Sequence, residues 1–138
     1  MPYATANDMR AEYGEDILVQ LTDAPAWDGV AIAGVNARLA SACPEIDGYV
    51  AKYYQSAPGV PVPALLRTIN MEMAYAKLHR VMTDDVKARL AEARRQLRDI
   101  STGMLKLDEG RGDLPGRAGQ VIVPDAVRTF SRDSLRGF

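Results

Sequence analysis

An apolar stripe in the first half of the chain constrains the fold more than any other feature of the sequence. Its members are spaced alternately by three and four residues, the period at which side chains return to one face of an α-helix. They are Ile32, Val35, Leu39, Ala42, Ile46, Tyr49 and Tyr53. The stripe predicts a long helix over residues 30–54. Because Pro44 lies inside it, where proline removes a backbone donor and clashes with the preceding turn, we expect a kink or break near Ser41.

A second long helix is predicted after a turn-forming segment. Residues 57–63 contain three prolines and a glycine, which cannot continue a helix, and Pro63 suits the first position of the next one. We expect that helix to run to about Met82 and to be central, because it has apolar residues on two sides. One side has Leu66, Ile69, Met73 and Ala76, and the other has Met71, Tyr75, Leu78 and Met82.

The last predicted helix begins after Thr83, a good capping residue that is followed by two aspartates. Its apolar stripe again alternates steps of four and three residues. The stripe consists of Val86, Leu90, Ala93, Leu97, Ile100 and Met104. Gly103 is expected to end or bend this helix.

Two short helices are predicted near the N-terminus. Thr5 and Asp8 have the spacing of a capping box, and Gly14 is suited to end the first helix. An acidic pair at the start of residues 15–21 suits the N-terminus of a second helix. Trp27 is expected to hold the turn-rich segment that follows against the core.

Length and composition favour one helical domain. The chain has 138 residues, one cysteine and a formal net charge of -1, so neither an internal disulfide nor a global attraction to nucleic acid is expected. Its first residues lack the features of a secretory signal, and no stretch is apolar enough to span a membrane, so we expect a cytoplasmic protein without membrane contact. The predicted fold is mainly α: a compact bundle of four or five helices over residues 1–107, then an extended, glycine-rich C-terminal arm over residues 108–138.

Residues suited to catalysis or metal binding are few. His79 is the only histidine, and it lies on a predicted helix, so we expect a packing or surface role. Cys43 has no neighbour that would activate its thiol and is expected to be a small core residue. The acidic segments 22–28 and 108–113 lack the ligand pattern of an EF-hand. We therefore expect neither an enzyme nor a bound metal or cofactor.

Two groups of residues are candidates for contacts with other molecules. The last helix carries Arg89, Arg94, Arg95 and Arg98, interrupted by acidic residues, and we expect a solvated, subunit-facing or channel-facing basic surface. The arm ends in a segment that contains both phenylalanines of the chain among charged residues, and such residues suit an interface. Its candidate interface residues are Phe130, Arg132, Asp133, Leu135, Arg136 and Phe138. The alternative is a tail that folds back on its own domain.

Four blocks occur in order along the sequence: YATANDMRAEYGEDILVQLTD, PEIDGYVAKYY, VPALLRTINMEMAYAKLH and the closing FSRDSLRGF. Together they resemble the Mu-like bacteriophage neck protein family of head–tail connectors or adaptors. The resemblance implies a helical bundle that forms a ring beneath the capsid portal and has no enzymatic role. We expect a dodecamer that matches the twelvefold symmetry of the portal.

The same resemblance implies the partners and the location. The partners would be other copies of the chain, the portal protein and the next neck or tail-terminator protein. Genomic DNA would pass through the channel without sequence-specific binding. The protein would occupy the host cytoplasm during assembly and the virion neck afterwards. Two alternatives stay open: a tail-completion or stopper protein of the same neck, and a small DNA-binding regulator that reads DNA with the last helix.

Overall fold

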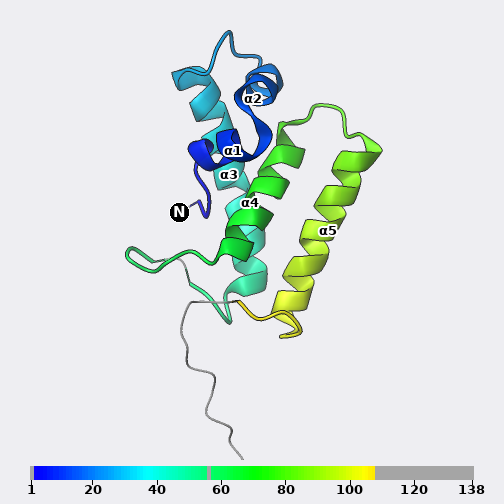
Figure 1. The fold of residues 1–138 in the computed structure, drawn as a ribbon. Helices are drawn as coiled ribbons and strands as arrows, with labels where there is room; N and C mark the ends of the chain where they lie inside the picture. The colour runs from blue at the N-terminus through cyan, green and yellow to red at the C-terminus, as the bar shows by residue number, and fades with distance from the viewer. Residues whose placement is uncertain (1, 56, 108–138) are drawn as a thin grey trace, which may run out of the picture.

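The computed structural model describes residues 2–55 and 57–107, and these form five helices and no strand. The helices are α1 (Ala6–Tyr13), α2 (Glu15–Thr22), α3 (Gly29–Val50), α4 (Ala64–Leu78) and α5 (Asp84–Ser101). The mainly α prediction is confirmed, and the predicted arm over residues 108–138 lies outside the described residues. α4 packs between α3 and α5, while α1 and α2 cover the N-terminal half of α3 (Figure 1).

The long helix α3 begins where its cap predicts. The Asp28 carboxylate accepts hydrogen bonds from the backbone N–H groups of Val30 and Ala31 at 2.9 and 3.2 Å. The predicted end at residue 54 is wrong, because α3 stops at Val50. There the Tyr53 N–H bonds to the Val50 carbonyl at 2.8 Å, a tight turn that redirects the chain. Tyr53 is consequently 40% exposed instead of lying on the buried stripe.

Of the kink or break predicted near Ser41, the break does not occur, since α3 continues through Pro44. Side chains from α4 supply donors to carbonyl groups in the turn that precedes the proline. Asn70 Nδ2 donates to the Leu39 carbonyl at 3.1 Å, and Lys77 Nζ donates to the Ser41 carbonyl at 2.6 Å. The carbonyl that loses its helical donor to Pro44 is that of Ala40, so these contacts do not replace the missing bond. They tie α4 to the turn on either side of that carbonyl.

Helix α4 is shorter than predicted. Pro63 is its N-cap, one residue before the helix, and the last helical residue is Leu78 instead of Met82. His79 explains the early end: its Nδ1 lies 2.9 Å from the Tyr75 carbonyl, while its own backbone N–H bonds to the Ala76 carbonyl at 3.3 Å. The ring takes the place of the backbone donor that would continue the helix, so the chain becomes extended here.

Helix α5 is amphipathic and ends as predicted. The Thr83 hydroxyl accepts a hydrogen bond from the Val86 N–H at 3.4 Å, and Gly103 adopts the left-handed φ of 78° that often follows a helix. Val86, Ala93, Leu97 and Ile100 are buried. Met104 was predicted on this stripe, but it follows the glycine and is 82% exposed.

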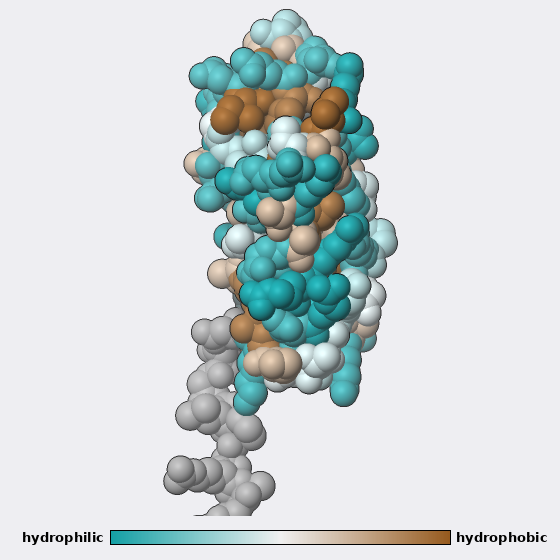
Figure 2. Space-filling model, turned by 90° about the vertical axis from the view of Figure 1, so that its right-hand side faces the viewer, coloured by the Kyte–Doolittle hydropathy of each residue, from teal (hydrophilic) through white to brown (hydrophobic). Residues whose placement is uncertain are grey.

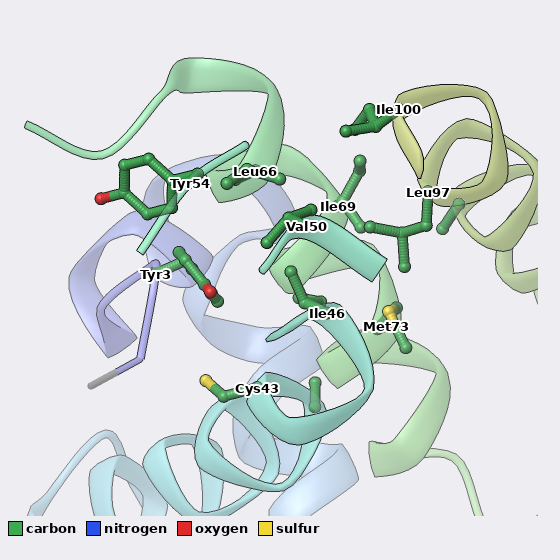
Figure 3. Close-up of a cluster of buried hydrophobic side chains, with 12 residues drawn as sticks. Tyr3, Cys43, Ile46, Val50, Tyr54, Leu66, Ile69, Met73, Leu97 and Ile100 are labelled. Carbon is green, nitrogen blue, oxygen red and sulfur yellow. The ribbon is translucent and has the colours of Figure 1, made fainter. Parts of the chain in front are cut away.

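The buried side chains form two clusters on the two sides of α4. The α5-side core, shown in Figure 3, consists of Tyr3, Ala42, Cys43, Ile46, Val50, Tyr54, Leu66, Ile69, Met73, Ala93, Leu97 and Ile100. The α1-side core consists of Ala4, Ala6, Met9, Leu18, Val35, Leu39, Met71, Ala74 and Leu78. α4 contributes to both, which confirms its predicted central position.

The short helices also follow their predicted local chemistry. The capping box of α1 is present: the Thr5 hydroxyl accepts from the Asp8 N–H at 3.2 Å, and the Asp8 carboxylate accepts from the Thr5 N–H at 2.8 Å. Trp27 is half-buried against the α1-side core, as predicted. Across residues 2–55 and 57–107, no helix is long and apolar enough to cross a membrane.

Candidate interaction surfaces

The four arginines of α5 do not form one basic patch. Arg94 and Arg98, together with Lys87, line a hollow of about 310 Å³ on one flank of α5. Arg89 lines a different hollow, between α5 and α4. The predicted basic surface is thus divided between two sides of the helix.

Carboxylates neutralise three of these arginines. Arg94 pairs with Glu45 of α3 at 2.8 Å, Arg95 with Glu92 at 2.8 Å, and Arg89 with Asp85 at 3.2 Å. Each pairing raises the pKa of the guanidinium, chiefly through the hydrogen bond for Arg94 and Arg95 and through the Asp85 charge for Arg89.

Arg98 is the exception, because it forms no ion pair within the part of the chain that the structure describes. The four arginines therefore present far less net positive charge than their number implies.

The hollow between α4 and α5 is a groove of about 320 Å³, which we call the α4–α5 groove. Its lining residues are Thr68, Ile69, Glu72, Ala88, Arg89, Glu92, Ala93 and Gln96. Ile69 and Ala93 are buried and form an apolar floor, while the charged and amide side chains form the rim. Apolar floors with a few polar groups at the edge are typical of sites that accept another molecule.

Glu72 is the least satisfied polar group in this groove. Its Oε1 lies 3.8 Å from Arg89 Nη1, an ion pair that is too long for a hydrogen bond. Its Oε2 is buried and accepts no hydrogen bond of normal geometry from residues 2–55 or 57–107. The carboxylate also lies near Tyr13, where burial first and Glu72 second raise the pKa of the phenol. An acceptor in this position favours a further donor.

Exposed apolar side chains gather at the two ends of α5. Val81 and Met82 lie in the loop before the helix, and Met104 and Leu105 follow it. Val81 is 77% exposed and Met104 82% exposed. Figure 2 shows this side of the molecule, with hydrophobic surface near both ends and mostly hydrophilic surface between them. Large exposed side chains of this kind often mark contact sites.

The two residues considered for catalysis have packing roles. Cys43 is buried, its Sγ donates to the Leu39 carbonyl at 3.2 Å, and burial raises the pKa of its thiol. His79 packs edge-on against the Tyr75 ring. Within the described residues, no group of histidine, cysteine and acidic side chains could hold a metal ion.

The buried polar residue Asn70 was not predicted from the sequence. Its Oδ1 accepts the Ala4 N–H at 3.2 Å, and its Nδ2 donates to the Leu39 carbonyl at 3.1 Å, so it ties the N-terminal segment to α3 and α4. The only sequence signal is a polar residue between Ile69 and Met71. That signal does not reveal a buried residue, because many helical asparagines face water.

A protein-family model described as bacteriophage Mu, Gp36 matches residues 3–123. The chain belongs to this family. The match covers most of the chain and confirms the predicted resemblance to Mu-like phage proteins. No curated protein matches the sequence significantly.

The Gp36-family match includes all five helices, both cores and the α4–α5 groove. The six candidate interface residues lie between Phe130 and Phe138, beyond the matched stretch and outside the described residues. Among the described residues, the candidate contact surfaces therefore lie on the helical body, and the interface role of the six arm residues stays a prediction.

Proposed function

We propose that this Gp36-family chain is a structural head–tail adaptor of a tailed phage. Copies form a ring below the portal and connect the capsid to the tail, without catalysing a reaction. The observation that carries the proposal is the exposed apolar surface at both ends of α5, on a chain that belongs to a phage protein family. A ring layer in a neck needs contacts above and below, and two such ends would provide them.

Burial of the end residues would stabilise stacking between layers. α5 has 18 residues and is therefore about 27 Å long, so Val81 and Met104 are well separated along the body. Removing apolar surface from water contributes about 25 cal/mol per Å². The proposed partners are the portal protein at one end and the next neck or tail-terminator protein at the other, with other copies of the chain at the flanks. The proposed ring is a dodecamer.

The charge distribution suits a channel that lets DNA pass. Because Arg89, Arg94 and Arg95 are already paired with carboxylates, α5 would attract phosphates only weakly. In the proposed ring, genomic DNA contacts the wall without sequence-specific binding. The protein would assemble in the host cytoplasm and remain in the virion neck. The same pairing makes a DNA-binding regulator less favourable.

Electron microscopy of phage particles that contain this chain tests the proposal directly. We expect a twelvefold ring of the helical body directly below the portal. A position farther along the neck would replace the adaptor with a stopper or tail-completion protein. Absence from mature particles would contradict both roles, and a gel-shift assay that showed sequence-specific binding at physiological salt would favour the regulator.

Variants of the two ends supply a matched test. Val81→Asp and Met104→Asp place a charge on the proposed stacking surfaces, and Ala37→Asp places one on an exposed part of α3 as a control. We expect each end variant to leave the helical circular dichroism unchanged and to reduce the joining of tails to filled heads at least tenfold. Normal joining in both end variants would contradict the proposal.

The C-terminal segment gives a further test. Removing residues 128–138 should leave the monomer folded, as measured by circular dichroism, and should abolish the joining of tails to heads. Infectious particles in normal numbers would show that the segment has no part in the neck.

A further inference from the structure

We infer that the α4–α5 groove binds residues 128–138 of a neighbouring copy of the chain. The inference rests on the proposed function, since it requires copies that lie side by side, and it names the site on the body that the C-terminal segment occupies. Three observations carry it: the apolar floor of the groove, its unsatisfied carboxylate and the composition of the segment.

The groove floor favours an apolar side chain. Ile69 and Ala93 are buried below the groove, and the small, exposed Ala88 leaves the wall open. A volume of about 320 Å³ can hold a large side chain and part of its backbone. Aromatic side chains are preferred anchors in such sites, because they bury a large area with little loss of conformational freedom.

The groove rim favours a positively charged donor. Glu72 and Glu92 line it together with Arg89. Arg95 pairs with Glu92 at 2.8 Å and Asp85 with Arg89 at 3.2 Å, so Glu72, which lies 3.8 Å from Arg89, has the weakest ion pair at the rim. Glu72 Oε2 is buried without a hydrogen bond from the described part of the chain. The Glu72 side chain is 27% exposed, so an arginine from another segment would pair with this carboxylate from the groove, and a charge-assisted hydrogen bond is stronger than a neutral one.

Residues 128–138 have the matching composition. The segment contains both phenylalanines of the chain, Phe130 and Phe138, and each lies two residues from an arginine. Its three arginines, at positions 128, 132 and 136, outnumber its one acidic residue, Asp133, which gives a side-chain charge of +2. An aromatic anchor with an arginine beside it fits an apolar floor with an acidic rim.

The connecting chain is long enough to reach a neighbour. Residues 108–127 are 20 residues, which could span at most about 66 Å when fully extended. That span is more than twice the length of α5, about 27 Å. The segment could therefore reach the groove of an adjacent body in a ring.

A photo-crosslinking experiment on the full chain tests the inference. A benzoylphenylalanine replaces Ala88 in the groove, or Ala91 on the other flank as a control, and ¹⁵N-labelled and unlabelled copies are mixed at assembling concentration. We expect position 88 to crosslink to residues 128–138 in mixed heavy–light pairs, and position 91 to give at least tenfold less of this product. Crosslinks only within one copy, or none at position 88, would overturn the inference.

Substitutions give an independent readout. The double variant Phe130→Ala/Phe138→Ala and the groove variant Ala88→Glu should each weaken self-association about tenfold or more in analytical ultracentrifugation, whereas Ala91→Glu should not. Circular dichroism verifies that each variant is folded. Unchanged self-association in both would also overturn the inference.

The two proposals fail in different ways. A ring below the portal in electron micrographs, without the crosslink between copies, removes only the groove assignment. Crosslinked copies without a ring in the particle remove the adaptor role and leave the groove as a self-association site.

Discussion

The two cores of this protein are built from different kinds of helix. The α5-side core joins the C-terminal half of α3 to α4 and to the 18-residue α5, so long helices meet along their apolar stripes. The α1-side core packs the two eight-residue helices α1 and α2 against the N-terminal half of α3 and the other side of α4. Helices of eight residues are unstable alone, so α1 depends on its capping box and both helices depend on a few buried anchors.

Because of this difference, stability is distributed unevenly along the chain. Met9 and Leu18 are the fully buried large side chains that α1 and α2 contribute, and their other large apolar contacts, such as the Tyr13 ring stacked on Tyr75 at 4.3 Å, are only partly buried. Leu97 and Ile100 of α5 are buried to the same degree, but they belong to a helix with two more buried residues. We therefore expect the α1-side core to open locally before the α5-side core unfolds.

Replacing the buried leucines should have the largest effect. Leu97→Ala and Leu18→Ala both remove a fully buried side chain and leave a cavity, at a cost of about 3 kcal/mol. We expect Leu97→Ala to lower the unfolding free energy of the whole domain in urea titrations. Leu18→Ala should instead remove hydrogen-exchange protection first from α1 and α2. Equal loss of protection in α5 would show that the two cores form one cooperative unit.

Asn70→Ala should be the next most severe change, because Asn70 lies where the N-terminal segment meets both long helices. The substitution leaves the Ala4 N–H buried without its acceptor, which costs about 2 kcal/mol. The measurement is the unfolding free energy together with exchange of the Ala4 amide. Thr68→Ala, an exposed change on the same helix, is the control and should cost less than about 0.5 kcal/mol. Similar losses in both variants would contradict the proposed link.

Removing the N-caps of α1 and α5 should show the same difference between the two cores, with smaller changes in free energy. Thr5→Ala and Thr83→Ala each remove a capping hydroxyl worth about 1 kcal/mol. We expect Thr5→Ala to unfold α1 locally, because an eight-residue helix has little else to sustain it. Thr83→Ala should lower the stability of the domain while α5 stays helical, as measured by residue-specific hydrogen exchange. Fraying of α5 equal to that of α1 would contradict the expected difference in local stability between the two helices.

The α1 cap should also give a pH dependence. Hydrogen bonding to the Thr5 backbone N–H lowers the pKa of Asp8 below its usual value of 3.8. A lowered pKa in the folded state means that this stabilisation is present above about pH 4 and is lost as the pH falls through the folded pKa. Exchange protection of α1 should therefore fall in acid more in the wild type than in Asp8→Asn. Identical acid profiles would show that the cap is not responsible.

Ion pairs should have the smallest effect in both regions. Arg94–Glu45 joins α5 to α3, and Arg80–Asp23 joins the loop after α4 to the end of α2. Both pairs are at least partly exposed, so double-mutant cycles should give less than about 1 kcal/mol for the first and near zero for the more exposed second. The coupling should decrease further in high salt. A coupling energy above about 2 kcal/mol would mean that ion pairs, not helix length, cause the difference in stability between the two cores.

Much of the fold could be predicted from the sequence because local rules dominate in it. The alternating steps of three and four residues located α3 and α5, and the Thr5 capping box located α1. The helix ends were less predictable. α4 stops early because the His79 ring bonds to the Tyr75 carbonyl, and no pattern in the sequence encodes that contact.

The pairing of charges on the surface could not be predicted, for a related reason. Arg89 and Arg94 are close in sequence, yet they face different hollows and pair with carboxylates from different helices. A count of charges along α5 includes Asp85 and Glu92, but it cannot include Glu45 and Glu72, which lie on other helices. The α4–α5 groove likewise exists only where two helices diverge, so its residues share no sequence motif.

The sequence alone was enough to predict a mainly helical protein of four or five helices, in the order that the structure shows, and to reveal the likeness to a phage family. Periodicity and caps act over a few residues, so they can be read without the rest of the chain. The tertiary structure alone decided that α3 continues through Pro44, that Asn70 is buried and that Glu72 faces an open groove. Each of these depends on groups that are brought together by packing of distant segments, and a linear pattern does not contain that proximity.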